Sequence, residues 1–461
     1  MNEKTIKRAL LAGVVLAAVA AAGALLALRD EREWTSDSET ALAEFQRGLE
    51  EEQKLYHDEA AERFARAVEL DPDFVAAKLY LLQRLAGREH EARREALKAE
   101  VRAADLTRLT PRERFLIEHF FAVREGDSER AGALVADYRE RHPDDPFALD
   151  VQCRALWYGR DFEKVEALYR RLIEIDPNWV TAQNHLGYLA MAQGDWQRAQ
   201  EQFEIYRYLA PDQANPHDSL GELWLLTGRW DEARSEFEAA LAIKPDFCHS
   251  WNHLVMLDLL TDRFEEAERT IEGIDRDRLC SQDEVRLQRC RLGVWRAFSR
   301  ADWRGAWASY RGQGCEQHYG DASMMAYEAA LLAGLDDEAA ALAAEIESFL
   351  EEHVPEPERR IAALYLEGVR LRQEGRPEEA AERLRQVDSL LTYFTSAGGY
   401  FKLFTRVELW HALTAAGRDD DAARVLADLR AVNPDFAERW TAPPGTDGVA
   451  AAAAVGARPA S

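Results

Sequence analysis

The chain has 461 residues, of which 47% are hydrophobic and 31% are charged, and its formal net charge is −26. This length exceeds what a single hydrophobic core organises, so we expect several domains or an extended array of repeats. The acidic balance argues against nucleic acid and anionic lipid as partners, because both attract a basic surface. The charge fits a solvated outer surface on a helical array, with a dedicated acidic site for a basic partner as the alternative.

A membrane anchor is predicted at the N-terminus. Residues 1–8 include Lys4, Lys7 and Arg8, and they precede an uncharged apolar run over residues 9–28. A helix over this run would be ~30 Å long, which is the thickness of a bilayer core. Positive charge in front of the run favours a cytoplasmic N-terminus. We therefore expect a single-pass protein of the inner (cytoplasmic) membrane whose remaining residues lie on the periplasmic side.

Two further interpretations of this segment stay open. Residues 22–24 (Ala-Gly-Ala) offer the small side chains that a signal peptidase needs, and cleavage there would release a soluble secreted protein. Gly13, Ala17 and Ala21 lie four residues apart, and small residues at this spacing let two membrane helices pack closely. The anchor is therefore also a candidate for forming a homodimer.

Helix pairs are expected over residues 39–440, after a polar linker over residues 29–38. Ser36, Asp37 and Ser38 are candidate N-caps for the first helix.

A second helix start is marked by a capping box. Thr110 is the cap, Pro111 takes the first helical position, and Glu113 completes the box. The clearest repeats are expected over residues 111–274, and further helix pairs over residues 285–440. Residues 392–400 are aromatic and contain two glycines, so they are expected to connect the last two pairs.

A period of 34 residues marks the centre of the chain. Prolines recur at this interval, at Pro143, Pro177, Pro211 and Pro245. Other corresponding pairs are Leu186 and Leu220, Gly187 and Gly221, Gly194 and Gly228, Ala199 and Ala233, and Phe203 and Phe237. In a helix–turn–helix unit the first glycine and the alanine let the two helices approach, and the aromatic fills the space between them. The second glycine ends the first helix in a left-handed conformation, and the proline ends the second helix.

This period and pattern resemble the tetratricopeptide repeat (TPR). With the apolar N-terminal segment, the chain resembles a bacterial TPR protein with an N-terminal membrane anchor. The resemblance implies an all-α fold, a TPR-like α-solenoid in which about ten helix–turn–helix repeats form a superhelix, preceded here by one transmembrane helix. Residues 441–461 are too small and polar to bury a core, and we expect them to be disordered.

The resemblance also implies a protein-binding surface. In TPR proteins the first helices of successive repeats line a concave face that holds a peptide or a helix of a partner protein. Helical phase places these side chains on that face: Arg154, Trp157, Tyr158, Asn184, Tyr188, Asp218, Ser219, Glu222, His249, Asn252, His253 and Met256. A mixed polar and aromatic surface of this kind suits hydrogen bonding to a peptide backbone.

The predicted function is that of a membrane-anchored, non-enzymatic scaffold that organises an envelope or membrane-associated complex through this concave face. One alternative is a sensor or regulatory protein in which partner or ligand binding is coupled to dimerisation of the anchor. The other is a secreted adaptor, if the N-terminal segment is cleaved. The sequence contains no G-x-S-x-G, Walker-type, G-x-G-x-x-G or H-E-x-x-H motif, so no catalytic residue and no cofactor are predicted.

The histidines and cysteines are weaker signals. His249 and His253 have the spacing of metal ligands on a helix, but no third ligand can be assigned, so we predict no metal site. The five cysteines are scattered and odd in number, and we expect buried free thiols. A bond between Cys280 and Cys290 is the alternative if the compartment is oxidising.

Overall fold

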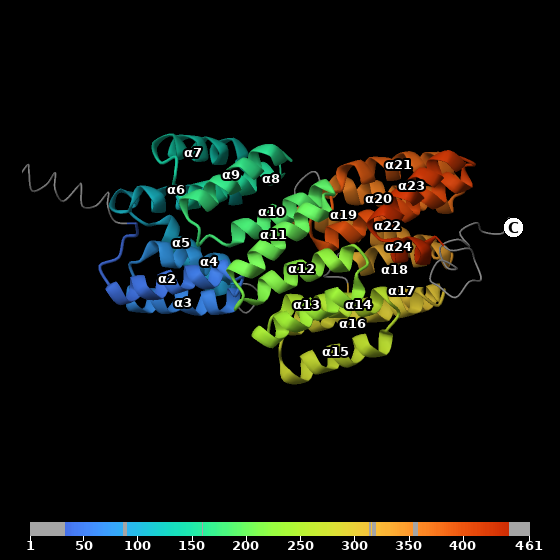
Figure 1. Cartoon of the computed structure of the whole chain (residues 1–461), viewed down its shortest axis with the longest axis horizontal. Coiled ribbons are helices and arrows are strands. Elements are labelled where there is room, and N and C mark those ends of the chain that lie inside the picture. Colours follow the sequence, from blue (N-terminus) through green and yellow to red (C-terminus); the bar gives the residue numbers. More distant parts are fainter. Residues whose placement is uncertain are drawn as a thin grey trace, which may run out of the picture. The chain divides into compact units, whose positions relative to one another are not determined.

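The structure, a computed structural model, describes residues 33–441 apart from short breaks at residues 86–89, 159, 313–314, 316–319 and 354–357. The described residues form α-helices and short 3-10 turns, with no β-strand among them (Figure 1). The predicted anchor over residues 9–28 and the predicted tail beyond residue 441 lie outside the described residues. None of the helices that are described has the length and apolarity of a membrane span.

The first of two compact units spans Met1–Ala182. Its described helices follow one another as pairs: α2 (Glu39–Gln53) with α3 (His57–Leu70), α4 (Val75–Arg84) with α5 (Glu91–Arg102), α6 (Pro111–Arg124) with α7 (Ser128–Arg141), and α8 (Pro146–Tyr158) with α9 (Phe162–Ile175). A 3-10 turn, Leu106–Arg108, precedes α6.

The second unit spans Gln183–Ser461 and contains most of α10 (Thr181–Gln193). The helices that follow are α11 (Trp196–Leu209), α12 (Ala214–Leu226), α13 (Trp230–Ile243), α14 (Cys248–Leu260), α15 (Phe264–Asp277), α16 (Gln282–Phe298), α17 (Trp303–Gly312), α18 (Asp321–Leu332), α19 (Asp336–His353), α20 (Glu358–Gln373), α21 (Pro377–Leu390), α22 (Thr395–Ala415), α23 (Asp419–Val432) and α24 (Pro434–Trp440). The described part of the chain thus holds eleven helix pairs and one closing helix, which confirms the predicted succession of pairs.

The predicted helix starts are confirmed. Ser38 caps α2 by accepting a hydrogen bond from the backbone of Ala41 at 3.2 Å. Thr110 and Glu113 form the capping box of α6, with Pro111 at the first helical position. Glu113 also accepts a 2.9 Å hydrogen bond from the backbone of Thr35, so the described end of the linker is fixed to the start of α6.

The predicted close approach within a repeat is confirmed too. A Cβ atom added to Gly187 would lie 2.4 Å from the ring of Phe203, and one added to Gly221 would lie 2.5 Å from the ring of Phe237. Only a glycine leaves room for the aromatic ring at these two positions. Gly228 follows α12 with a φ of +79°, the left-handed conformation predicted for the second glycine.

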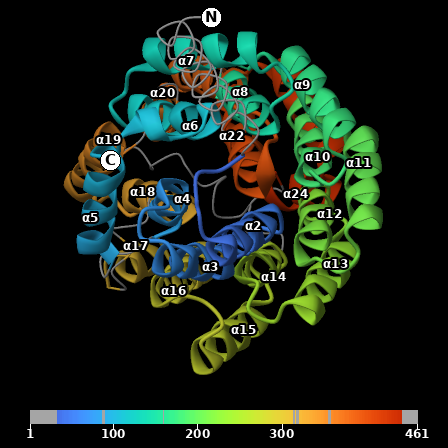
Figure 2. The ribbon, with the colours of Figure 1, turned by 90° about the vertical axis from the view of Figure 1, so that its left-hand side faces the viewer.

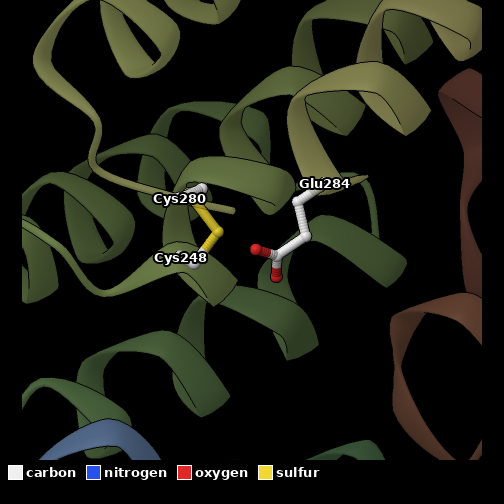
Figure 3. A group of neighbouring side chains, drawn as sticks. All are labelled: Cys248, Cys280 and Glu284. Carbon is white, nitrogen blue, oxygen red and sulfur yellow. A yellow bond between two sulfur atoms is a disulfide. The ribbon is translucent and has the colours of Figure 1, made fainter. Parts of the chain in front are cut away.

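The cysteine prediction is wrong for four of the five residues. Cys248 bonds to Cys280, with 5.5 Å between their Cα atoms (Figure 3), and Cys290 bonds to Cys315. Stacking brings the start of α14 beside the segment that joins α15 to α16, a juxtaposition that cysteine spacing does not reveal. Cys153 is a buried free thiol, as expected.

The expected connection over residues 392–400 is also wrong in part. Helix α22 already begins at Thr395, so the two glycines of this segment lie inside its first turns. Gly399 allows a close approach to another helix, which is described below.

Candidate functional site: the inner face of the second unit

The first helices of the pairs form one side of the second unit, and we call the side chains of α10, α12, α14, α16, α18 and α20 that point toward α22 and α24 the inner face. Figure 2 shows α22 and α24 on the inner side of the curve traced by α10 and α12, and α12 contacts α22 directly. The second helices α11 and α13 lie on the opposite side of that curve (Figure 2).

A buried ion triad joins α12 to α14 on this face. The ring of His253 lies between two carboxylates, with Nδ1 3.0 Å from Asp218 Oδ1 and Nε2 3.2 Å from Glu222 Oε1. Ser250 donates a 2.6 Å hydrogen bond to Asp218, and the hydroxyl of Tyr188 on α10 donates to Glu222. Three successive repeats are therefore tied together by one polar network.

The electrostatics of this network identify the charged form of each member. Burial lowers the pKa of His253, but Asp218 and Glu222 more than offset burial and raise this pKa to about 10. The ring is therefore an imidazolium at neutral pH and donates from both nitrogens. Burial and the neighbouring carboxylates raise the pKa of Tyr188 well above its ordinary value, so its hydroxyl stays neutral.

The contacts of His253 decide whether His249 and His253 could bind a metal ion together. Both nitrogens of His253 are engaged by carboxylates, so a metal ion would have to displace one of them. His249 is exposed and lies against the ring of Phe247, outside the triad. The two histidines do not converge on one point.

Figure 3 shows a second cluster, in which Glu284 lies near the Cys248–Cys280 disulfide and accepts a 2.7 Å hydrogen bond from Ser281 as part of a helix cap.

The C-terminal helices are held on the inner face by long-range contacts. A Cβ atom on Gly399 of α22 would lie 2.6 Å from the side chain of Leu226, so only glycine allows this approach. The hydroxyl of Tyr400 donates to the carbonyl of Leu225, and the amide of Asn433 donates to the carbonyl of Leu226 at 3.1 Å. Carbonyls at the end of α12 are thus satisfied by side chains from the end of the chain.

A cavity of about 490 Å³ lies between α14, α16, α18, α20, α22 and α24. Aromatic rings dominate its lining. Trp440 lies edge to face with Trp295 and Phe404, with ring centroids 6.1 Å and 4.8 Å apart, and Phe401 lies 4.9 Å from Tyr365. Met256, which was predicted on the binding face, also lines this cavity.

Charged side chains occupy two places on the cavity wall. Glu328 and Glu408 are buried and both bond to Arg372, at 2.6 Å and 2.8 Å. Elsewhere Asp321 pairs with Arg291 at 2.8 Å and accepts a 2.9 Å hydrogen bond from the indole of Trp295. The side chains of Arg291 and Asp321 are more exposed than those of Arg372 and Glu328, so solvent reaches the cavity nearer to Asp321 than to Glu328.

The predicted binding residues fall into three groups. Asp218, Glu222 and His253, with Tyr188, form the network described above, and the hydroxyl of Ser219 lies 3.2 Å from that of Tyr188. Asn184 is buried on α10. Asn252 accepts a 2.8 Å hydrogen bond from Gln288, and Met256 lines the cavity. The remaining residues are Arg154, Trp157, Tyr158 and His249. Arg154 is exposed and pairs with Asp150, Trp157 is half-buried against Phe162, and Tyr158 ends α8 with its side chain outside the described part. Contact of any of these residues with a partner stays a prediction.

Sequence reasoning missed the charged cluster of Glu328, Arg372 and Glu408. In a chain with 84 acidic residues, a pair of glutamates carries no positional signal. The available signal was that each of the three lies three or four residues from a buried apolar residue on its own helix, namely Met325, Val369 and Ala412.

Large apolar side chains are exposed on the outer helices α11 and α13. Tyr208 is 84% exposed, Leu209 48%, Ile205 41% and Ile243 36%. Leu209 and Ile243 hold the same position in successive repeats, and Arg207 of α11 pairs with Glu236 of α13, which shows that these helices are neighbours. We call Ile205, Tyr208, Leu209 and Ile243 the outer apolar patch.

No protein-family model matches the chain, and no curated protein matches it. Among solved structures it is similar to Cut9 with Hcn1 from the APC/C (TM-score 0.47, 14% identity, 92% of this chain and 80% of that chain). It is also similar to PilW, a type IV pilus biogenesis factor (TM-score 0.36, 15% identity, 44% and 92%), and to a tetratricopeptide repeat protein from Parabacteroides merdae (TM-score 0.35, 15% identity, 65% and 97%). All these TM-scores are below 0.5, so the assignment to TPR-like helix pairs rests on this chain's own 34-residue period and Gly–Phe packing.

Proposed function

We propose that this protein is a non-enzymatic, TPR-like scaffold that binds a protein partner outside the cytoplasm and is held at the inner membrane by residues 9–28. In this role it organises an envelope or membrane-associated complex. The stack of helix pairs supports the proposal, because such arrays offer extended surfaces on which a partner makes several weak contacts together.

The outer apolar patch is the single observation that carries the binding role. Ile205, Tyr208 and Leu209 share one face of α11, and contiguous exposed apolar patches mark interaction sites. Tyr208, which is 84% exposed, brings a large amphipathic surface to this face. The inner face is less available at its centre, because Asp218, Glu222 and His253 already bond to one another. The concave-face hypothesis stays as the second candidate through Arg154 and His249, which are both exposed.

The two disulfides support the proposed location outside the cytoplasm. Disulfides persist in oxidising compartments such as the bacterial periplasm and are rare in the cytosol. The chain carries two of them, Cys248–Cys280 and Cys290–Cys315. They are what an extracytoplasmic location predicts.

The test is crosslinked capture of partners from native membranes with three forms of the full chain. The first is wild type, the second carries Ile205→Ala, Tyr208→Ala, Leu209→Ala and Ile243→Ala, and the third carries Arg154→Ala and His249→Ala. We expect the second form to lose partners that the wild type and the third form retain. Loss only in the third form would favour the concave face, and retention of all partners by both variants would contradict both surfaces. Circular dichroism and thermal melting of each form control for folding.

The alternatives for the N-terminus have their own measurement. N-terminal sequencing of the mature chain distinguishes an intact anchor from a secreted adaptor cleaved after residue 24. A sensor coupled to anchor dimerisation predicts that crosslinking between two copies changes when the partner is added. The scaffold proposal predicts no such change.

A further inference from the structure

The aromatic cavity of the second unit has the chemistry of a cation site. Aromatic rings line it, and the faces of such rings are electron-rich and attract positive charge. Trp295, Phe404 and Trp440 pack edge to face, and Tyr365 lies against Phe401. A volume of about 490 Å³ lies within the ~300–1,000 Å³ range of small-molecule pockets. The cavity is therefore large enough for an organic ligand rather than a bare ion.

The charges on the wall select the sign of that ligand. Three carboxylates line the cavity, those of Asp321, Glu328 and Glu408, and one guanidinium, that of Arg291. Arg291 is paired with Asp321 at 2.8 Å and hydrogen-bonds to Gln288, so an anion would meet a cation whose charge is already balanced. Arg372 lies behind the wall and is shared by Glu328 and Glu408. With all groups ionised, the three carboxylates and two guanidinium groups leave one net negative charge.

We propose that this cavity binds an organic ammonium ion, with its apolar body among the aromatic rings and its charged nitrogen beside Glu328 and Glu408. The site goes beyond the proposed scaffold function and does not depend on it. A partner could be bound through the outer apolar patch whether or not the cavity is occupied.

The protonation of the acidic pair supports this assignment. Burial and the neighbouring Glu408 carboxylate together raise the pKa of Glu328 to about 8, although Arg372 acts to lower it. At neutral pH the carboxyl groups of Glu328 and Glu408 therefore share one proton, which they lose when a second positive charge binds beside them. A bound ammonium ion takes over the role of that proton, so binding should release close to one proton at pH 7. Other titratable groups near the pair are Tyr365, which burial keeps neutral, and His411, whose pKa burial lowers to about 3.

The experiment is isothermal titration of the full chain with three probes that share a benzyl group. Benzyltrimethylammonium is the cation, neopentylbenzene is its neutral carbon counterpart, and 3-phenylpropionate is an anion. We expect the cation to bind at least about tenfold more tightly than either of the others. Titration in two buffers of different ionisation enthalpy should show proton release at pH 7 that disappears at pH 9.

Two variants and one control locate the binding. Glu408→Gln keeps an oxygen for Arg372 but removes the charge, and Tyr365→Leu removes a ring beside the pair. Each should weaken cation binding about tenfold, whereas the exposed control Glu379→Gln on α21 should leave it unchanged. Equal binding of the neutral or anionic probe, no binding of the cation, or unchanged binding in both Glu408→Gln and Tyr365→Leu would overturn the proposal. Partner capture in the membrane experiment is unaffected by any of these results, so the two proposals fail separately.

Discussion

The central repeats and the C-terminal helices of the second unit are built from the same kind of helix pair but are held by different contacts. In the central repeats, Gly221 packs on Phe237 and Tyr188 bonds to Glu222, so partners are no more than one repeat apart in sequence. Tyr400 and Asn433, in contrast, bond to carbonyls of α12 that are 175 and 207 residues away. The comparison teaches that this solenoid is not stabilised by neighbouring repeats alone, because its end also packs back on its centre.

The largest effect is expected from breaking a central repeat. Phe237→Ala removes a fully buried ring and leaves a space next to Gly221, which should lower the free energy of unfolding by about 3–5 kcal/mol. Urea denaturation followed by circular dichroism measures the loss. Tyr208→Ala is the matched control, because its exposed ring should cost about 0.5 kcal/mol or less. Equal costs for the two variants would contradict the packing described for the repeats.

The next effect comes from the disulfide that joins the start of α14 to the segment between α15 and α16. Changing Cys248 and Cys280 together to Ser should lower the free energy of unfolding by about 2–4 kcal/mol, because the bond restricts the unfolded chain. The control is Cys153→Ser, which removes the free thiol and no bond. In protein taken from cells and denatured without reductant, only Cys153 should react with a thiol reagent. Labelling of all five cysteines would contradict both the bonds and the proposed compartment.

A smaller effect tests the contact of the C-terminal helices with α12. Asn433→Ala removes the N-cap of α24, where Asn433 accepts a 2.9 Å hydrogen bond from Phe436, and also the bond to Leu226. We expect a loss of about 1–3 kcal/mol in the free energy of unfolding. Asn433→Ser keeps an oxygen for the cap, but its side chain is too short to reach α12. Its free energy of unfolding should therefore lie between those of wild type and Asn433→Ala. A serine variant as stable as wild type would show that the bond to α12 contributes nothing.

The smallest change, the one expected for a shift of a single pH unit, separates the two regions. His253, in the central repeats, has a pKa raised from 6.5 to about 10, so its contribution is fully present below pH 6.5 and is lost as pH rises toward 10. His411, in α22, has a pKa lowered from 6.5 to about 3 by burial and by Arg372, so its contribution is present above pH 6.5 and is lost as pH falls toward 3. Each histidine should change stability by no more than about 1.4 kcal/mol per pH unit.

The corresponding variants check these signs. His253→Gln should flatten the alkaline part of the stability profile. Glu328, whose pKa is raised from 4.5 to about 8, adds a separate loss of stability as pH rises through that range in both chains. His411→Gln should flatten the acid part. Denaturation midpoints measured from pH 4 to pH 10 give both profiles. If His253→Gln flattened the acid part and His411→Gln the alkaline part, the environments described for the two rings would be contradicted.

The same comparison explains how far the sequence could predict the fold. The helix pairs were predictable because their signals are local: Gly187 and Phe203 recur one period later, and Thr110 and Glu113 mark a helix start. The packing of α22 and α24 on α12 was not predictable, because nothing in the sequence around Gly399 and Asn433 indicates partners so far away. Gly399 was interpreted as part of a connection, since glycine is typical of loops, whereas the structure needs it for close approach to Leu226.

The candidate sites show the same limit. Helical phase placed Tyr188, Glu222 and His253 on one predicted binding face, and in the structure the three side chains bond to one another. Phase does not tell whether such a face is solvated or internally bonded. The cavity depends on helices α14 to α24 together, so neither its volume nor the meeting of Glu328 with Glu408 is visible in any single segment.

The packing of α22 on α12 is the central claim, and a designed crosslink tests it most directly. Cγ of Leu226 lies 3.3 Å from the place that a Cβ atom on Gly399 would take, which is within the reach of a disulfide. The full chain with Leu226→Cys and Gly399→Cys is oxidised mildly, digested and analysed by mass spectrometry. We predict a peptide that links positions 226 and 399, and no link in a control chain with Tyr208→Cys and Leu226→Cys, in which Gly399 is kept. Free thiols at 226 and 399 in the folded, oxidised protein would contradict the account.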